Sequence, residues 1–239
     1  MCARMETSDD YEGSVVLVTG VSGALGSAIA EAFDAAGATV CGADIVAPDD
    51  EDALVDPEPV EFYETDATDE SSVEETVGAI LDEHGRLDAL CNVAGTWRGG
   101  DPIHETDVEE FDTLFDVNLR SMFLVSKHAI PHLRETEGAI VSVSARSSLE
   151  GGEGDGPYRA SKAGVRLLTE TIAEENLGTV RANAIMPSVI DTPMNREMMP
   201  DADHDEWVDP ADIADVVLFL CSSEAGVTSG AAVPVYGEV

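Results

Sequence analysis

One glycine-spaced segment near the start of the chain constrains the fold more than any other feature. An unbroken apolar run over 15–18 gives way to Gly20, Gly23 and Gly26, and apolar residues then recur at helical spacing up to Ala36. The segment is therefore predicted to form a strand, a tight turn and a helix. Glycine lets the backbone bend sharply and leaves the N–H groups at the helix start open to a pyrophosphate. This arrangement predicts a dinucleotide-binding site.

A second strand is predicted over 39–43, and Asp44 follows it, about twenty residues beyond the glycine turn. An acid at this place can accept hydrogen bonds from an adenosine ribose, although a plain turn cap is the alternative interpretation of Asp44. No arginine or lysine stands in the glycine turn or directly after Asp44 to bind a 2′-phosphate. NAD is therefore predicted over NADP.

The rest of the chain alternates apolar strand segments with amphipathic helices. Further strands are predicted over 60–63, 87–93, 139–144, 180–185 and 232–236, and helices over 73–84, 111–133, 157–176 and 210–222, with a loop over 187–208. This alternation indicates a doubly wound α/β fold of Rossmann type, with a parallel seven-stranded sheet and helices on both faces. The 239 residues suffice for one such domain, predicted over 13–239, after a flexible N-terminal tail over 1–12.

The net charge is the most unusual bulk property of the chain. There are 49 Asp and Glu residues against 12 Lys and Arg, which gives a formal net charge of −37. The acids are spread between the apolar segments, so they are predicted to cover a folded surface instead of forming a tail. Such a surface repels nucleic acid and anionic membranes. We predict a halophilic protein, in which multimolar salt screens the repulsion between carboxylates.

The spacing of the cysteines and the lack of a long apolar run indicate the cellular compartment. Four cysteines lie far apart in the sequence without metal-type spacing: Cys2, Cys41, Cys91 and Cys221. Buried free thiols in a reducing cytosol are predicted. No signal peptide or apolar run of membrane length is present, so a cytoplasmic protein without a membrane partner is expected. No metal site is predicted, because His128 and His132 share a helix face but lack a third ligand.

Tyr158 and Lys162 lie four residues apart in the helix predicted over 157–176, and therefore on one helical face. A lysine cation beside the phenol favours phenolate and lowers the pKa of Tyr158 toward the working pH. That property suits a proton donor or acceptor for an alcohol and carbonyl pair. The chain has only two lysines, Lys127 and Lys162, so a chance pairing on the surface is the less favoured interpretation.

With these residues in place, the sequence resembles the short-chain dehydrogenase/reductase family over nearly its whole length. The matching segments are TGVSGALG (19–26), Asp66 after the third strand, NVAG (92–95), NLR (118–120), YRASK (158–162), VRANAIMPSVIDTPM (180–194) and VPVYG (233–237). The resemblance implies an NAD-dependent oxidoreductase that acts on a secondary alcohol or sugar hydroxyl, or on the corresponding carbonyl. It also implies a homodimer or homotetramer with a small-molecule substrate.

The resemblance further implies roles for individual residues. Tyr158 would be the acid/base, Lys162 would hold the nicotinamide ribose hydroxyls and tune Tyr158, and Asn118 would anchor a water in a proton relay. The residues implied at the phosphates, the adenosine and the middle of the dinucleotide are Gly20, Ser22, Gly23, Leu25, Gly26, Asp44, Asp66, Ala67, Asn92, Ala94 and Gly95. The residues implied near the nicotinamide, besides Tyr158 and Lys162, are Pro187, Ile190 and Thr192.

The sequence departs from the family pattern where the family places a serine that holds the substrate oxygen. That position is Ala145, so Ser144 is predicted to supply the hydroxyl, with Ser147 as the alternative. Ala145 also leaves open a second hypothesis, a non-catalytic NAD-binding regulatory protein. The glycine spacing, with Ala24 where the family has its middle glycine, leaves a third, epimerase or dehydratase chemistry.

Overall fold

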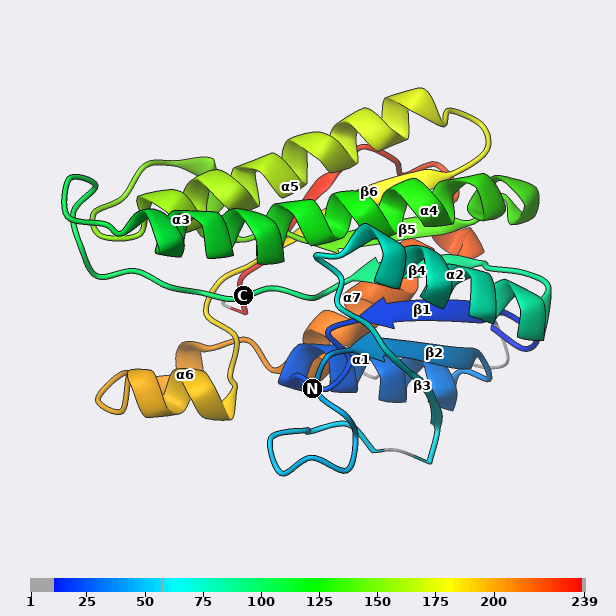
Figure 1. Ribbon diagram of the computed structural model, residues 1–239, viewed down its shortest axis with the longest axis horizontal. Helices are drawn as coiled ribbons and strands as arrows, with labels where there is room; N and C mark the ends of the chain where they lie inside the picture. The colour runs from blue at the N-terminus through cyan, green and yellow to red at the C-terminus, as the bar shows by residue number, and fades with distance from the viewer. Residues whose placement is uncertain (1–10, 57, 238–239) are drawn as a thin grey trace.

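Seven parallel strands form one sheet in the computed structural model, which describes residues 11–56 and 58–237 (Figure 1). The strands are β1 (Val15–Thr19), β2 (Thr39–Asp44), β3 (Val60–Glu64), β4 (Ala89–Asn92), β5 (Ala139–Val143), β6 (Arg181–Pro187) and β7 (Ala232–Val235). Their order across the sheet is β3-β2-β1-β4-β5-β6-β7, and every neighbouring pair is parallel. The predicted doubly wound α/β fold is confirmed.

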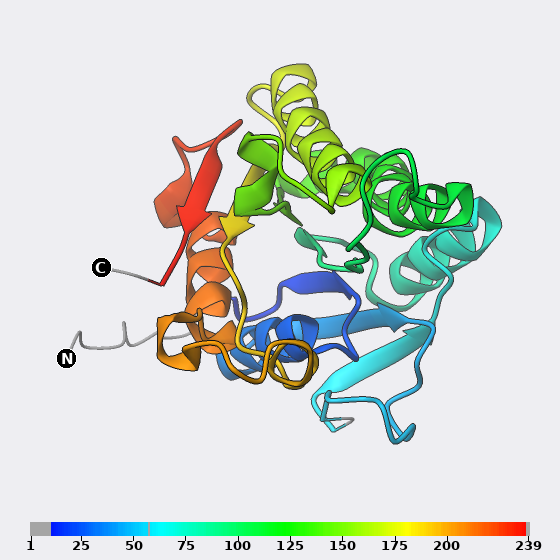
Figure 2. The ribbon, with the colours of Figure 1, turned by 90° about the vertical axis from the view of Figure 1, so that its left-hand side faces the viewer.

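Helices cover both faces of this sheet (Figure 2). The longer helices are α1 (Ala24–Ala35), α2 (Glu70–His84), α3 (Val108–Phe115), α4 (Ser121–Thr136), α5 (Gly156–Glu175) and α7 (Pro210–Cys221). On one face α1 and α7 pack together, with Phe33 and Ile213 fully buried between them and the sheet. On the other face α2, α4 and α5 bury a second apolar cluster that includes Ile80 and Leu133. All five residues of β1 are buried because helices cover both faces.

The strand order reverses between β1 and β4. The chain runs from β1 outward to β2 and β3, and then returns to β4 on the other side of β1. In open parallel sheets, such a reversal leaves a crevice at the carboxyl ends of the two central strands, where ligands bind. The glycine turn after β1 and the segment after β4 therefore meet at this crevice.

Helix α2 begins three residues before the start predicted from its apolar periodicity. Its N-cap residue is Asp69, whose side chain accepts a hydrogen bond of 3.0 Å from the backbone N–H of Ser72. Its C-cap is Gly85 in the left-handed region, at φ 71°. Capping by polar residues extended the helix beyond its apolar stripe, which is why periodicity alone gave it too late a start.

The helix predicted over 111–133 is longer than expected and is interrupted. Helix α3 continues through a five-residue π-helical segment, Asp116–Arg120, directly into α4. A π-helical segment adds a residue to a helical turn and occurs often at functional sites. Asn118 lies within it, so the predicted relay residue belongs to the irregular part of this helix.

The loop predicted over 187–208 contains two short helices, α6 (Pro193–Met198) and a 3₁₀ turn over His204–Glu206. Thr192 caps α6 by accepting a hydrogen bond of 3.1 Å from the backbone N–H of Asn195, and Pro193 takes the first helical position. Thr-Pro is a usual helix start, so the sequence did contain a signal for this helix.

The packed domain includes Tyr11, which the sequence had placed in a flexible tail over 1–12. Tyr11 is buried edge-on against Phe33, with ring centroids 5.0 Å apart, and its hydroxyl donates to the Leu218 carbonyl at 2.5 Å. Residues 1–10 of the predicted tail, Cys2 among them, lie outside the described residues. The other cysteines, Cys41, Cys91 and Cys221, are buried and free, as predicted.

Within 11–56 and 58–237, no helix combines the length and the apolar character that crossing a bilayer requires.

Candidate active site

Two glycines of the turn after β1 are required by close backbone packing. A Cβ on Gly20 would lie 2.8 Å from the Cα of Ala94, and a Cβ on Gly26 would lie 2.0 Å from the Gly20 carbonyl oxygen. Gly23, the N-cap of α1, meets only the Gly20 carbonyl oxygen, at an ordinary 3.5 Å. Gly20 and Gly26 therefore shape the turn. Gly23 leaves the start of α1 free of a side chain.

The start of α1 fits an anionic group. No side chain caps it, and its first turn contains no acidic residue, in a chain that has 49 of them. The free N–H groups and the positive end of the helix dipole are thus available to a phosphate. Ser22 and Leu25, which the resemblance places at the cofactor, are both buried within this turn.

Asp44 is fixed at the end of β2 by two backbone hydrogen bonds. One carboxylate oxygen accepts from the N–H of Ser22 at 3.0 Å, and the other accepts from the N–H of Val46 at 3.1 Å. The Ser22 hydroxyl donates to the Val46 carbonyl at 2.6 Å. The carboxylate is therefore both a turn cap and a group held against the glycine turn, so the two interpretations of Asp44 are compatible.

Thr19 joins the two central strands at the crevice, a role that the sequence analysis missed. Its hydroxyl oxygen accepts hydrogen bonds from the N–H groups of Val93 and Ala94, at 3.1 and 3.2 Å. These bonds fix the segment after β4 beside the glycine turn. The signal was present, because Thr19 directly precedes Gly20 at the end of a buried strand.

Asn92, at the end of β4, links this strand to α4 and β5 beside the crevice. Its side-chain amide donates to the hydroxyls of Ser126 on α4 and Ser142 on β5, at 3.1 and 3.3 Å, and the residue is buried. The amide therefore holds β4 in place behind the crevice. The dinucleotide contact that the resemblance implies for Asn92 stays a prediction.

Asn118 is held rigidly in the π-helical segment by three hydrogen bonds. Its side-chain oxygen accepts from the Thr96 N–H at 2.7 Å, and its amide donates to the Thr96 carbonyl at 3.0 Å and to the Ser161 hydroxyl at 3.1 Å. A Cβ added to Gly95 would lie 3.0 Å both from the Asn118 oxygen and from Lys162 Nζ. The structure thus brings Gly95, Asn118 and Lys162 together, and adds Thr96 and Ser161 as their supports.

Lys162 is a buried cation without a carboxylate partner among the described residues. Its Nζ donates to the Val143 carbonyl at the end of β5, at 2.9 Å, and the residue is 5% exposed. Burial lowers the pKa of the Lys162 ammonium from 10.5 to about 8. The other lysine, Lys127, pairs with Glu70 on the surface, so Lys162 is the buried lysine of the two.

Tyr158 lies one turn before Lys162 on α5 and is partly buried. Burial and the nearby Asp155 carboxylate raise the pKa of Tyr158 to about 12, while the Arg159 guanidinium opposes this shift. The predicted lowering of this pKa is therefore wrong. The physical reason is that the desolvation of the phenolate outweighs the nearby positive charge.

The hydroxyl of Ser144 faces the interior. It donates to the Lys162 carbonyl at 2.8 Å and lies 3.2 Å from the Ser148 hydroxyl, in a residue that is 2% exposed. Ala145 follows it in extended conformation, so the two side chains point to opposite sides. Ser147 is half-buried and its carbonyl accepts from Arg159. Ser144 therefore braces the turn of α5 that holds Lys162, and the bond to the substrate oxygen predicted for Ser144 stays a prediction.

The resemblance assigns one group of residues to the adenosine end of the cofactor and another to the nicotinamide end, and both groups lie in or next to loops. Asp66 accepts from the N–H and the hydroxyl of Thr68, at 2.9 and 2.7 Å, in the exposed turn that includes Ala67. At the other end, Ile190 follows Pro187, the last residue of β6, and forms an isolated bridge with Val208. Thr192 accepts a bond as the cap of α6 and keeps its own hydroxyl proton to donate.

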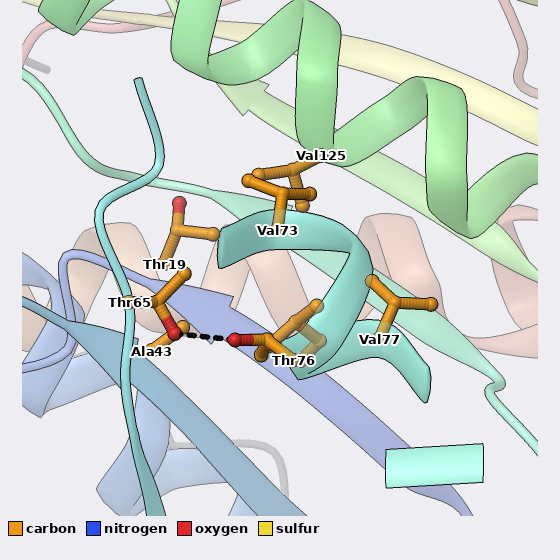
Figure 3. Close-up of a pocket in the computed structure, with 8 residues that line it drawn as sticks. Thr19, Ala43, Thr65, Val73, Thr76, Val77 and Val125 are labelled. Atoms are coloured by element: carbon orange, nitrogen blue, oxygen red, sulfur yellow. Dashed lines mark hydrogen bonds between the residues drawn. The ribbon is translucent and has the colours of Figure 1, made fainter. Parts of the chain in front are cut away.

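A small apolar pocket lies beside the crevice, between the sheet and α2 (Figure 3). Thr19 and Ala43 line it from the strands, and the Thr65 and Thr76 hydroxyls are 2.7 Å apart and bond to each other. Because these hydroxyls satisfy one another, the pocket offers a ligand little polar recognition. It belongs to the packing beneath α2 and not to the predicted cofactor path.

Comparison with known proteins agrees with this geometry. The family described as enoyl-(acyl carrier protein) reductase matches residues 20–237. The 3-oxoacyl-[acyl-carrier-protein] reductase FabG of Thermotoga maritima is 33% identical, over 95% of this chain and 97% of its own length. The meso-2,3-butanediol dehydrogenase of Serratia marcescens is 31% identical over 95% of this chain and 94% of its own length. The ligand-free aldohexose dehydrogenase of Thermoplasma acidophilum superposes with a TM-score of 0.86 at 30% identity, covering 96% of this chain and 94% of that one.

The chain belongs to the short-chain dehydrogenase/reductase family, a family of oxidoreductases that use a nicotinamide cofactor. The resemblance noted from the sequence motifs is confirmed at this level. The matched region contains the glycine turn, Asn118, Tyr158 and Lys162, the positions that the motifs had singled out.

Proposed function

We propose that the chain is an NAD-dependent dehydrogenase that transfers hydride between the nicotinamide and a secondary alcohol or sugar hydroxyl, or the corresponding carbonyl. The observation that carries this proposal is the buried Lys162, one helical turn beyond Tyr158 and without a carboxylate partner among the described residues. Burying an unpaired ammonium costs free energy, so its presence favours a catalytic use.

In the oxidative direction, the Tyr158 oxygen accepts the proton of the substrate hydroxyl while the carbinol carbon gives up a hydride. The bound cofactor supplies the acceptor for that hydride. The Lys162 ammonium would stabilise the phenolate form of Tyr158, which burial and the Asp155 carboxylate disfavour. Asn118, which Thr96 and Ser161 fix in position, would hold a water that passes the proton from Lys162 to solvent.

The relatives support the reaction class, and their names cover several different classes of substrate. Their names specify a 3-oxoacyl group, a diol and an aldohexose, which share a carbon that alternates between alcohol and carbonyl. A panel of polyols, sugars, hydroxy acids and acyl thioesters, assayed with NAD and NADP in molar KCl, tests the proposal. Turnover of any of them supports a dehydrogenase, whereas tight NAD binding without turnover identifies a regulatory protein.

The NAD preference rests on Asp44, whose carboxylate is fixed beside the glycine turn and would repel a 2′-phosphate. We expect Asp44→Asn to lower the ratio of kcat/KM for NAD over NADP by about tenfold or more, because the substitution removes the charge but keeps the shape. Asp49→Asn, the same charge change on an exposed loop, should leave the ratio unchanged. Equal efficiency with both cofactors in the unmodified chain would contradict the preference.

The serine position decides between an enzyme and a non-catalytic NAD-binding protein, which Ala145 favours. A donor to a developing alkoxide is worth about 2.7–4 kcal/mol in transition-state stabilisation, and Ala145 has none to offer. We expect Ala145→Ser to raise kcat by about tenfold. Ser144→Ala should lower it more than Ser147→Ala, because it frees the turn that carries Lys162. Rate constants for the three variants on one substrate test this order, and a loss of rate in Ser147→Ala alone would assign the bond to the substrate oxygen to Ser147.

We also propose a homodimer or homotetramer in the cytoplasm of a halophile. A shallow groove over α3, the π-helical segment, α4 and α5 is lined by the apolar side chains Phe115, Leu119, Phe123 and Leu168, with Asp116 and Arg120 among them. Phe123 is 49% exposed on a surface otherwise dominated by charge, which supports burial against a second copy. Light scattering in molar KCl measures the assembly directly, and a monomer mass would exclude it.

A further inference from the structure

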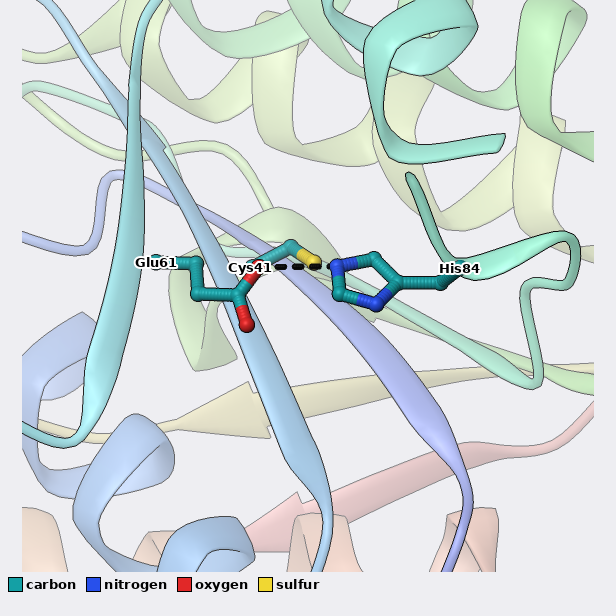
Figure 4. A group of neighbouring side chains, drawn as sticks. All are labelled: Cys41, Glu61 and His84. Atoms are coloured by element: carbon teal, nitrogen blue, oxygen red, sulfur yellow. Dashed lines mark hydrogen bonds and ion pairs between the residues drawn. The ribbon is translucent and has the colours of Figure 1, made fainter. Parts of the chain in front are cut away.

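Three side chains with metal-binding atoms meet at the edge of the sheet, away from the site described above (Figure 4). They are Cys41 on β2, Glu61 on β3 and His84 in the last turn of α2. The cysteine sulfur, a carboxylate oxygen and a ring nitrogen all lie within 4.8 Å of one another. Figure 4 shows the three side chains converging on one point.

Each ligand is positioned by regular structure. Cys41 and Glu61 are register partners on neighbouring parallel strands, so their side chains leave the sheet on the same face. His84 reaches the same face from the end of α2, where Gly85 stops the helix. The residues are 20 and 23 apart in sequence, which explains why spacing alone predicted no metal site.

We propose that Cys41, Glu61 and His84 bind a Zn²⁺ ion, with water in the fourth position. A thiolate with an imidazole selects zinc over Mg²⁺ and Ca²⁺, which prefer oxygen ligands. Zinc bonds of about 2.0–2.3 Å place the ligand atoms of a tetrahedron about 3.3–3.7 Å apart. The cluster is within that reach once the 2.7 Å contact between Glu61 and His84 opens by about 0.6–0.8 Å.

Exposure and charge both favour a cation here. Cys41 is fully buried, whereas the side chains of His84 and Glu61 are 16% and 45% exposed, so an ion can enter from the carboxylate side. Thiolate and carboxylate together balance the two positive charges of zinc. A second carboxylate, on Glu83, lies 3.3 Å from the Tyr63 hydroxyl nearby. A plain ion pair between Glu61 and His84 is the ordinary alternative, and it makes no use of the thiol.

The ion would hold the edge strand in place. It would join β3, the last strand of the sheet, to β2 and to the end of α2. Cys41 lies three residues before Asp44, about 10 Å along the strand, so the ion sits well back from the crevice. We therefore expect zinc to stabilise the fold without taking part in the hydride transfer.

Cobalt is the probe of choice, since Co²⁺ occupies zinc sites and gives a thiolate-to-metal absorption band. The full chain, stripped of metal with a chelator and kept reduced in molar KCl, should bind one Co²⁺ with this band, and Zn²⁺ should displace it. Cys41→Ser should abolish the band. Cys221→Ser, at another buried thiol, should leave it intact.

The two ligands outside the core, Glu61 and His84, give variants that do not disturb it. Glu61→Gln and His84→Gln should each weaken Co²⁺ binding by about tenfold or more, whereas Glu74→Gln, the same charge change elsewhere on α2, should not. Zn²⁺ should raise the melting temperature of the chain but not that of Cys41→Ser. A band that survives in Cys41→Ser, absence of a band in the unmodified chain, or equal affinity in Glu61→Gln and Glu74→Gln would overturn the proposal.

Discussion

Replacing Tyr158 by phenylalanine should lower kcat by at least about a hundredfold while leaving NAD binding unchanged. The substitution removes only the hydroxyl that exchanges a proton with the substrate and keeps the ring in its partly buried place on α5. The supports of the site remain, because Asn118 bonds to Thr96 and Ser161, and Lys162 bonds to Val143, independently of the phenol. Single-turnover rates together with a direct NAD binding measurement separate chemistry from binding.

A matched control is Tyr63→Phe, which removes a hydroxyl on the edge strand that faces Glu83. This variant should turn over at the rate of the unmodified chain. Near-normal turnover in Tyr158→Phe would show that another group carries the proton. A loss of NAD binding in the same variant would mean that Tyr158 acts first as a cofactor ligand.

Transfer from multimolar KCl to dilute buffer should lower the melting temperature by about 10 °C or more, and should unfold part of the population. The chain has a net charge of −37, and 12 basic residues cannot pair with 49 acids. In dilute buffer the carboxylates repel one another over tens of ångströms, whereas molar salt shortens the screening length to about 3 Å. For a domain of this size, 10 °C corresponds to roughly 3–5 kcal/mol.

Sucrose at matched osmolality separates screening from a general solute effect, since an excluded osmolyte also strengthens burial. Screening predicts that KCl restores the melting temperature and that sucrose does not. Thermal unfolding followed by circular dichroism in both solutes gives the comparison. A melting temperature independent of KCl would contradict the halophilic interpretation.

The fold followed from the sequence because its signals are local. The run over 15–18 is buried on both faces, the glycine turn follows it directly, and the alternation of strands and helices defines the parallel sheet. The cap residue Asp69 starts α2 earlier than its apolar periodicity predicted, and Thr192 starts α6, a helix that the periodicity did not predict. Those two differences come from side-chain hydrogen bonds that a hydrophobic pattern does not register.

The finer properties of the site depend on contacts between distant segments. The pKa of Tyr158 is set by its burial and by Asp155, and the direction of the Ser144 hydroxyl by its bond to the Lys162 carbonyl. The meeting of Cys41 with His84 likewise requires the sheet and α2 to be in place. The motifs predict which residues form the site, whereas tertiary packing decides the charge state and orientation of those residues.

The burial of Lys162 leaves the molecule with a single well-exposed lysine. Lys127 on α4 is about half exposed, and Lys162 is enclosed between α5 and the end of β5. Among the lysines, amine-reactive dyes and cross-linkers should therefore attach at Lys127. A fluorophore at Lys127 would test the proposed assembly, because energy transfer between labelled copies occurs only if two chains associate.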